Sequence, residues 1–349
     1  MKGFGLSIPK RKLVTEQKEG KLMKIFKTEK EQHLHSVTSS SDCDTFVAAD
    51  ESRINMYNIE YKDRPIYNLI DYERKNTTFD DERITSTVFN PHNPSLFLYT
   101  TSNGKINICD LRERSDFHQR ATLTFETSGK SAKLSSNVFS KWLNCVSSAK
   151  FSHNPTQLFS RDYLSVKMWD LRAAQSNTAA SIVNMHTKPV YSAQVTDYME
   201  RNLGVLLDND SLEDQFFLDV SPDGKYMATG AYNKSGHVLD INATTNTVIN
   251  TVFGSDRNSQ AGKLKVYGKA KRLVNSNTAG GLELKVDLKK RVNMGCWAPQ
   301  KDIHQGKQTL ALVFRNCIYL YHNNNQKQTS SRTRNVLGTT TINNQRKRV

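Results

Sequence analysis

The sequence has no long apolar run, no cysteine pair and few tryptophans. No stretch approaches the ~18 consecutive apolar residues of a membrane-spanning helix, and the start, MKGFGLSIPKRKL, lacks the continuous apolar core of a secretory signal. The five cysteines are scattered, without a Cys-x-x-Cys motif, as in proteins whose thiols stay reduced. We therefore expect a cytoplasmic protein, with the nucleus as a second compartment, and no association with membranes.

Enzyme and metal motifs are also missing. The sequence contains no Gly-x-Ser-x-Gly, no P-loop and no His-Glu-x-x-His. Asp208-Asn209-Asp210 resembles the start of a calcium loop but lacks the glycine at its sixth position. His33 and His35 would share one face of a strand, where a surface pair is favoured over a metal site. We expect no catalytic residue, cofactor or metal.

The formal charge of +15 is unevenly distributed. Residues 1–35 carry nine Lys/Arg and four Glu, residues 255–291 carry ten Lys/Arg and three acids, and residues 324–349 carry six Lys/Arg and no acid. These segments together exceed the total charge, so the rest of the chain is slightly acidic. A nucleic-acid-binding domain usually carries its basic patch on the fold itself, so the distribution favours solvated basic segments over nucleic-acid binding.

Five segments repeat one plan, in which three alternating runs are separated by polar turns. The segments are 37–60, 88–112, 149–172, 218–242 and 296–323. Asn-Pro, Ser-Pro-Asp-Gly and Ser102-Asn103-Gly104 supply the turns, and the period-two alternation indicates strands. Three strands per segment and a fourth from each spacer would give four-stranded antiparallel sheets. Their repetition predicts an all-β fold, a WD-repeat β-propeller; a β-sandwich is the alternative.

Two regions depart from this plan. Residues 255–291 are rich in Lys, Gly and Asn and predict a basic insertion in the propeller. Residues 324–349 are polar and low in complexity and predict a disordered basic tail. The predicted propeller blades then span residues 25–323, after a basic segment at 1–24.

Acidic residues gather in the spacers that should form loops at the edges of the blades. They include Asp80 and Asp81 in one spacer and Asp208 and Asp210 in another. Loops on a rigid scaffold commonly bind ligands, and acidic loops would favour basic peptides. A solvated loop surface with no ligand explains the same pattern equally well.

The segment RDYLSVKMWDL (161–171) resembles the signature of the B-type (WD-repeat) regulatory subunit of protein phosphatase 2A. Further segments resemble this family in the same order, among them FVAADESRINMYNIE (46–60), SNGKINICDLR (102–112) and FSKWLNCVSSAKFSH (139–153). The resemblance covers roughly residues 6–323.

The resemblance implies a seven-bladed propeller that performs no chemistry. In that family the propeller docks on a helical-repeat scaffold (A) subunit and presents basic phosphoprotein substrates to the catalytic (C) subunit. An acidic groove receives those substrates, and His33 and Glu51 match groove positions, with Glu51 where the family has Asp. The residues expected to bind substrates are therefore His33, Glu51, Asp80, Asp81, Asp208 and Asp210.

The chain departs from the family pattern at its start. LSIPK (6–10) resembles the end of a hairpin arm, so about five of the seven blades are expected, and residues 1–24 are a remnant of that arm. The leading hypothesis is a substrate-recruiting regulatory subunit of the phosphatase. The alternatives are a WD-repeat interaction platform outside the phosphatase and a paralogue that binds substrates without the scaffold. An RNA-associated propeller would rest on the basic insertion and tail.

Overall fold

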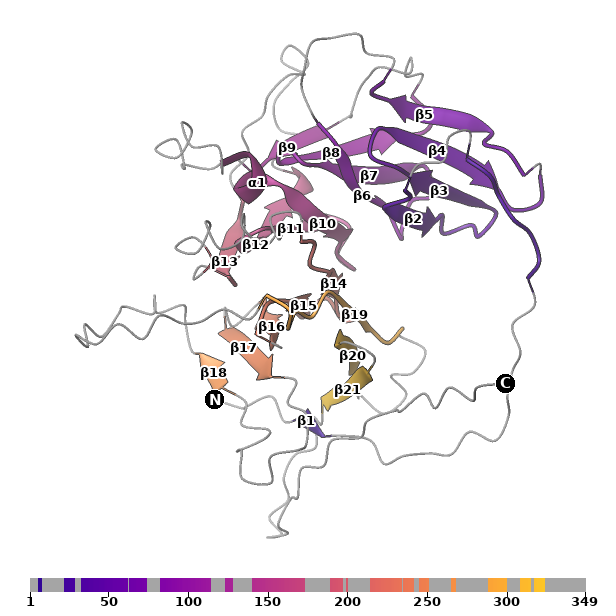
Figure 1. Ribbon diagram of the computed structural model, residues 1–349. Coiled ribbons are helices and arrows are strands. Elements are labelled where there is room, and N and C mark those ends of the chain that lie inside the picture. Colours follow the sequence, from indigo (N-terminus) through magenta and orange to yellow (C-terminus); the bar gives the residue numbers. More distant parts are fainter. Residues whose placement is uncertain are drawn as a thin grey trace, which may run out of the picture. The chain divides into compact units, whose positions relative to one another are not determined.

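The computed structural model describes most of the predicted blades and leaves several connecting segments aside. The described residues are 6–7, 22–28, 33–61, 63–73, 82–113, 123–127, 140–172, 189–196, 199, 214–233, 235–241, 245–250, 265–267, 288–299, 308–314 and 317–323. They form two compact units, one of residues 17–215 and one of residues 1–16 with 216–349. Each unit is a set of antiparallel sheets (Figure 1).

The unit of residues 17–215 holds three four-stranded sheets, each with its strands in chain order. The first sheet consists of β2 (Ser36–Ser39), β3 (Thr45–Ala49), β4 (Arg53–Asn58) and β5 (Tyr67–Asp71). The second consists of β6 (Ile84–Phe89), β7 (Leu96–Thr101), β8 (Lys105–Asp110) and β9 (Leu123–Glu126). The third consists of β10 (Val146–Phe151), β11 (Gln157–Asp162), β12 (Ser165–Asp170) and β13 (Tyr191–Gln194), and the short helix α1 (Ser140–Asn144) precedes it.

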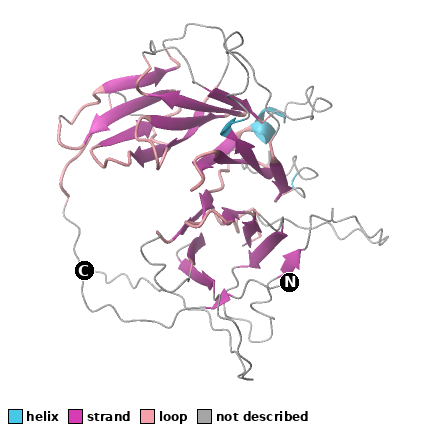
Figure 2. Ribbon diagram, turned by 180° about the vertical axis from the view of Figure 1, so that it is seen from behind, coloured by secondary structure: helices cyan, strands magenta, loops and turns pink. Residues whose placement is uncertain are grey.

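The other unit holds two sheets. The fourth sheet consists of β14 (Leu218–Val220), β15 (Tyr226–Gly230), β16 (Ser235–Asp240), β17 (Thr245–Asn250) and β18 (Lys265–Tyr267). The fifth consists of β19 (Met294–Trp297), β20 (Thr309–Phe314), β21 (Cys317–Asn323) and β1 (Leu6–Ser7). Strands dominate both units, as Figure 2 shows. The predicted all-β class of repeated four-stranded antiparallel sheets, typical of WD-repeat propellers, is confirmed.

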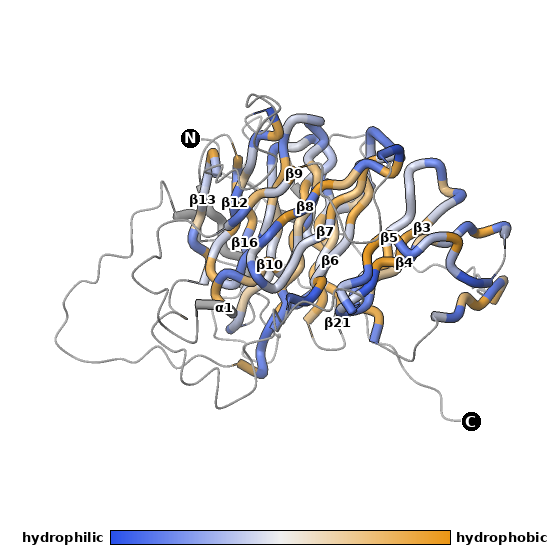
Figure 3. The backbone as a smooth tube through the Cα atoms, turned by 90° about the horizontal axis from the view of Figure 1, so that it is seen from above, coloured by the Kyte–Doolittle hydropathy of each residue, from blue (hydrophilic) through white to orange (hydrophobic). Residues whose placement is uncertain are grey.

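Alternation of apolar and polar residues along the strands explains why the sheets pack face to face. Figure 3 shows hydrophobic and hydrophilic positions interleaved along the strands. In β3 and β4 the side chains of Val47, Ala49 and Ile54 are buried against Phe89 and Phe97 of the second sheet. Successive residues of a strand face opposite sides of its sheet, so each sheet presents one apolar set to its neighbour.

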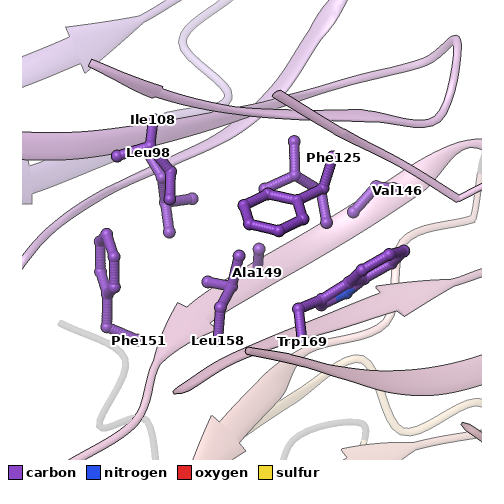
Figure 4. Packing of buried hydrophobic residues seen from close by; sticks show 9 residues of the cluster. Leu98, Ile108, Phe125, Val146, Ala149, Phe151, Leu158 and Trp169 are labelled. Atoms are coloured by element: carbon purple, nitrogen blue, oxygen red, sulfur yellow. The ribbon is translucent and has the colours of Figure 1, made fainter. Parts of the chain in front are cut away.

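The second and third sheets enclose the cluster drawn in Figure 4. Trp169 of β12 is 1% exposed, and its ring centroid lies 5.6 Å from that of Phe125 of β9. The indole Nε1–H donates a 2.8 Å hydrogen bond to Oγ of Ser160 on the neighbouring strand. Trp169, which precedes Asp170 at the end of β12, is therefore an aromatic residue whose apolar ring is buried and whose polar atom is satisfied within the same sheet.

Neighbouring sheets of this unit are also joined by short polar side chains of their inner strands. Ser36 Oγ accepts a 3.0 Å hydrogen bond from the Thr87 amide, which links β2 to β6. Thr85 Oγ1 on β6 donates a 2.5 Å bond to the carbonyl of Val146 on β10. Hydrogen bonds satisfy these buried polar groups and fix the alignment of adjacent inner strands.

The fifth sheet pairs a strand from the predicted N-terminal segment 1–24 with the last strand of the predicted propeller. Leu6 pairs with Asn323 and Ser7 pairs with His322, so β1 is the outer strand beside β21. The spacers supply the fourth strands β5, β9, β13 and β17, as the repeat plan predicts, whereas the fifth sheet takes this strand from the start of the chain. The boundaries 1–24, 25–323 and 324–349 remain predictions, and residues 324–349 lie outside the described residues.

Within the predicted basic insertion, the structure describes residues 265–267 and 288–291. The first of these segments, β18, pairs with β17 as a fifth strand, through Thr247 and Val266 among others.

Gly104 explains why the hairpin turn Ser102-Asn103-Gly104 could be predicted from the sequence. Its φ of 82° lies in the left-handed region, and a Cβ there would approach Thr127 Oγ1 to 2.6 Å and the Asn144 carbonyl to 2.8 Å. Both the backbone conformation and the lack of space therefore require glycine at the end of Ser102-Asn103-Gly104. The predicted hairpin between β7 and β8 is present.

Thiol reactivity is expected to differ sharply between Cys109 and the exposed cysteines Cys43 and Cys296. Cys109 packs against the apolar cluster of the first two sheets, and burial, with a smaller contribution from Glu113, raises the pKa of its thiol to about 12. A rise from the ordinary 9.0 lowers the thiolate fraction at pH 8 by roughly a thousandfold, and thiolate is the reactive form. Iodoacetamide at pH 8 should modify Cys43 and Cys296 first, as read by peptide mass spectrometry. In urea, which unfolds the chain, Cys109 should react as fast as Cys43 and Cys296. Fast reaction of Cys109 in the native protein would show that its thiol is not buried.

Candidate functional site

The two predicted site residues that the structure describes, His33 and Glu51, lie at one end of the first sheet. In each sheet of the unit of residues 17–215, this end carries the start of the inner strand, the middle hairpin turn and the end of the outer strand. In the first sheet it is marked by the pairs Ser36–Ala49 and Arg53–Asp71. We call this end of the three sheets the entry edge. Ile84, which begins β6, donates its amide to the Glu51 carbonyl at 2.8 Å, so the entry edges of the first two sheets adjoin.

The structure places two of the six predicted site residues. His33 lies just before β2 and is exposed, and Glu51 lies in the turn between β3 and β4 with its side chain 53% exposed. The remaining four, Asp80, Asp81, Asp208 and Asp210, lie outside the described residues, so their contribution stays a prediction. Asp80 and Asp81 fall between β5 and β6 in the chain, and both strands meet the entry edge.

The turn that bears Glu51 is organised by its neighbour Asp50, which leaves the Glu51 side chain free to point outward. Asp50 Oδ1 accepts hydrogen bonds from the amides of Ser52 at 2.8 Å and Arg53 at 2.6 Å. Asp162 does the same in the third sheet, accepting from the amides two and three residues ahead at 3.0 Å and 2.6 Å. An aspartate that accepts such amides is a common turn former.

Most described carboxylates of the entry edge form ion pairs with Lys or Arg side chains of the same chain. Arg53 lies 2.9 Å from Glu73 and 3.5 Å from the buried Asp71. Lys105 lies 3.4 Å from Glu82, which also accepts a hydrogen bond from Thr101. The carboxylates of Asp71, Glu73 and Glu82 are therefore at least partly neutralised within the chain.

Lys167 lies 2.6 Å from Asp162, and both side chains are largely buried. Arg161 and Asp162 are thus buried parts of the third sheet, with Arg161 donating to Thr196 Oγ1 at 3.4 Å. The strand that carries the family signature therefore does not present these two charges to solvent.

Glu51 differs from these carboxylates in exposure and in partner. Its Oε1 lies 3.5 Å from Nε2 of His35, whose side chain is 28% exposed. The carboxylates of Asp71, Glu73, Glu82 and Asp162 have side-chain exposures of 0%, 33%, 16% and 5%. Glu51 is therefore the most exposed of these five carboxylates and the one that faces a histidine.

Sequence reasoning missed His35. The resemblance selects His33, two residues earlier, and the sequence alone favours no more than a surface pair for His35. The signal that would have indicated His35 is the register of β2 against β3. The His35 amide donates to the Ala49 carbonyl at 2.9 Å, which places His35 beside the turn that bears Glu51.

The described residues hold no group of three or more His, Cys, Asp or Glu side chains arranged for a metal ion. Among the same residues no helix is long and apolar enough to cross a membrane. The chemistry that this edge can perform with its described residues is the binding of cations by an exposed carboxylate.

Comparison with known proteins relates the chain to phosphatase regulatory subunits. It is 28% identical over 301 residues to the B gamma isoform of the serine/threonine-protein phosphatase 2A 55 kDa regulatory subunit, both that of Oryctolagus cuniculus and that of Homo sapiens, which covers 85% of this chain and 61% of each relative. It is 29% identical over 296 residues to the phosphatase 2A regulatory subunit sur-6 of Caenorhabditis elegans, covering 83% of this chain and 55% of that protein. No protein-family model matches. The chain thus spans about three-fifths of the length of these relatives.

Proposed function

We propose that the chain, a partial relative of the 55 kDa B-type regulatory subunits of protein phosphatase 2A, is itself a regulatory subunit of such a holoenzyme. The observation that carries the proposal is the similarity along 85% of the chain to proteins named as regulatory subunits. The repeated four-stranded sheets support it, since they are the architecture that the resemblance implies. In this role the chain catalyses no reaction.

Its task would be to recruit basic phosphoprotein substrates through the entry edge and to hold them near the catalytic subunit. The exposed carboxylate of Glu51 supports this part of the proposal, because an exposed anion attracts cationic side chains and adds to selectivity for them. Asp80, Asp81, Asp208 and Asp210 would enlarge the anionic surface. The scaffold and catalytic subunits are the proposed protein partners.

The experiment is affinity purification of the tagged 349-residue chain from eukaryotic cells, followed by detection of the scaffold and catalytic subunits. A tagged full-length B-type regulatory subunit serves as the positive control. We expect both partners to be recovered, together with phosphatase activity on a basic phosphopeptide. Recovery of neither partner, while the control recovers both, would contradict the proposal.

A second arm separates scaffold binding from substrate binding. The chain spans 61% of the length of its relatives. The experiment can therefore also show a chain that binds substrates through the entry edge but does not bind the scaffold subunit. Such a chain would retain a basic phosphopeptide without phosphatase activity. The variant Glu51→Gln should form the same complex as the native chain and bind the phosphopeptide more weakly.

A further inference from the structure

The ion pair between His35 and Glu51 is chemically different from the other pairs of the entry edge. Its 3.5 Å separation joins a carboxylate to an imidazole, which is cationic only when protonated. Arg53 and Lys105, the cations of the neighbouring pairs, stay charged throughout the physiological pH range. The strength of the pair at Glu51 therefore changes with pH, whereas the others remain constant.

Backbone hydrogen bonds hold both members of the pair in place. The His35 amide donates to the Ala49 carbonyl at 2.9 Å, immediately before the turn, and the Glu51 carbonyl accepts the Ile84 amide at 2.8 Å. The two side chains thus project from anchored positions on two elements of the first sheet. With exposures of 28% and 53%, they remain accessible to an incoming ligand.

The other charged and titratable groups near the pair come from four elements of the entry edge. His33 precedes β2, Asp50 and Arg53 flank Glu51 in the β3–β4 turn, Glu73 follows β5, and Glu82 and Arg83 lead into β6. Asp50 is held by the turn amides, Arg53 by Glu73 and Asp71, and Glu82 by Lys105 and Thr101. Among the described residues, His35 is the titratable group that contacts the Glu51 carboxylate, at 3.5 Å.

We propose that His35 is a specificity-determining residue whose protonation controls how strongly Glu51 binds a cationic side chain. This inference rests on the proposed function, in which the entry edge receives basic substrates. A neutral imidazole leaves the Glu51 carboxylate to a lysine or arginine of the ligand. A protonated imidazole competes for that carboxylate, and a basic ligand then binds more weakly.

The expected effect is modest because both groups are partly exposed. Ion pairs at protein surfaces contribute a few tenths to one kcal/mol, which corresponds to a change in affinity of about two- to fivefold. The change should appear between pH 7.5 and pH 5.5, the interval in which histidine side chains take up a proton. Lysine side chains of a ligand keep their charge over this interval, so the ligand itself contributes no pH dependence.

The test measures the affinity of a hexalysine peptide for the full chain by anisotropy at both pH values, with tetramethylrhodamine on its N-terminus as a label whose charge does not change in this interval. The variants are His35→Asn, His35→Lys and Glu51→Gln. The control is His92→Asn, which changes an exposed histidine in the turn between β6 and β7, at the opposite end of the second sheet. His35→Asn should give tight binding at both pH values. His35→Lys should give weak binding at both, and His92→Asn should behave like the native chain.

Each outcome bears on a different claim. If His35→Asn keeps the pH dependence of the native chain, or if His92→Asn removes it equally, His35 does not control Glu51 and the inference is wrong. If the native chain binds hexalysine and Glu51→Gln binds it as tightly at pH 7.5, the carboxylate is not part of the binding surface. That result, or the absence of any binding, contradicts the proposed binding of basic substrates at the entry edge. It also contradicts this inference, which depends on that binding.

Discussion

Replacement of Trp169 by alanine is expected to lower the free energy of unfolding by about 3–5 kcal/mol, the range for removing a buried aromatic side chain. Trp169 is 1% exposed and contacts the cluster shared by the second and third sheets, including Phe125. The truncation opens a cavity between two sheets that meet face to face. Urea denaturation of the purified chain measures the change as a shift of the unfolding midpoint.

Two controls separate the cavity from the lost hydrogen bond. Trp169→Phe keeps most of the apolar contact but removes the Nε1–H that donates to the buried Ser160 hydroxyl at 2.8 Å, for a cost of about 1–3 kcal/mol. Trp142→Ala, in the short helix α1, removes an indole that is only partly buried and should cost less than Trp169→Ala. Equal losses for Trp142→Ala and Trp169→Ala would contradict the central place of Trp169 in the core.

The strands were predictable because their signals are local. Alternation in segments such as 105–110 and the glycine of the Ser102-Asn103-Gly104 turn act on neighbouring residues, and the structure confirms both. The partner of β1 was not predictable in the same way, because pairing Leu6 with Asn323 joins the two ends of the sequence. Nothing in a two-residue strand specifies a partner more than three hundred residues away.

The candidate site was predictable only in part, for an electrostatic reason. Counting acids in the spacers shows where anions gather but not which of them meet internal cations. Such a count groups Glu82 with Asp80 and Asp81, yet Glu82 lies 3.4 Å from Lys105, a residue of the adjacent hairpin. A count of acids also cannot identify His35. Its contact with Glu51 depends on the register of β2 beside the turn that bears Glu51.

Asp162→Ala is expected to destabilise the chain by about 3–5 kcal/mol, as found when one partner of a buried ion pair is removed. The side chains of Asp162 and Lys167 are 5% and 15% exposed, and Oδ2 lies 2.6 Å from Nζ. Alanine leaves the ammonium of Lys167 without its carboxylate in a poorly hydrated place. It also removes the acceptor of the Leu164 and Ser165 amides, which loosens the turn between β11 and β12.

Asp170→Asn, at the end of the neighbouring strand β12, is the control within the same segment. Its carboxylate is paired with Arg172 at 2.8 Å, and the hydrogen bond from that side chain lowers the pKa of Asp170, but the two side chains are 25% and 72% exposed. An exposed pair of this kind contributes at most about 1 kcal/mol. Urea denaturation of both variants at pH 7 should therefore give clearly unequal shifts of the midpoint.

A second substitution identifies the source of the loss at Asp162. If the uncompensated charge dominates, adding Lys167→Met to Asp162→Ala should restore part of the stability, because methionine fills a similar volume without a charge. If the turn amides dominate, the double variant should be no more stable than Asp162→Ala, while Asp162→Asn, which keeps an acceptor oxygen, should lose less. In either case, a loss at Asp162 far above that at Asp170 means that the segment RDYLSVKMWDLR stabilises the third sheet through a buried pair of charges.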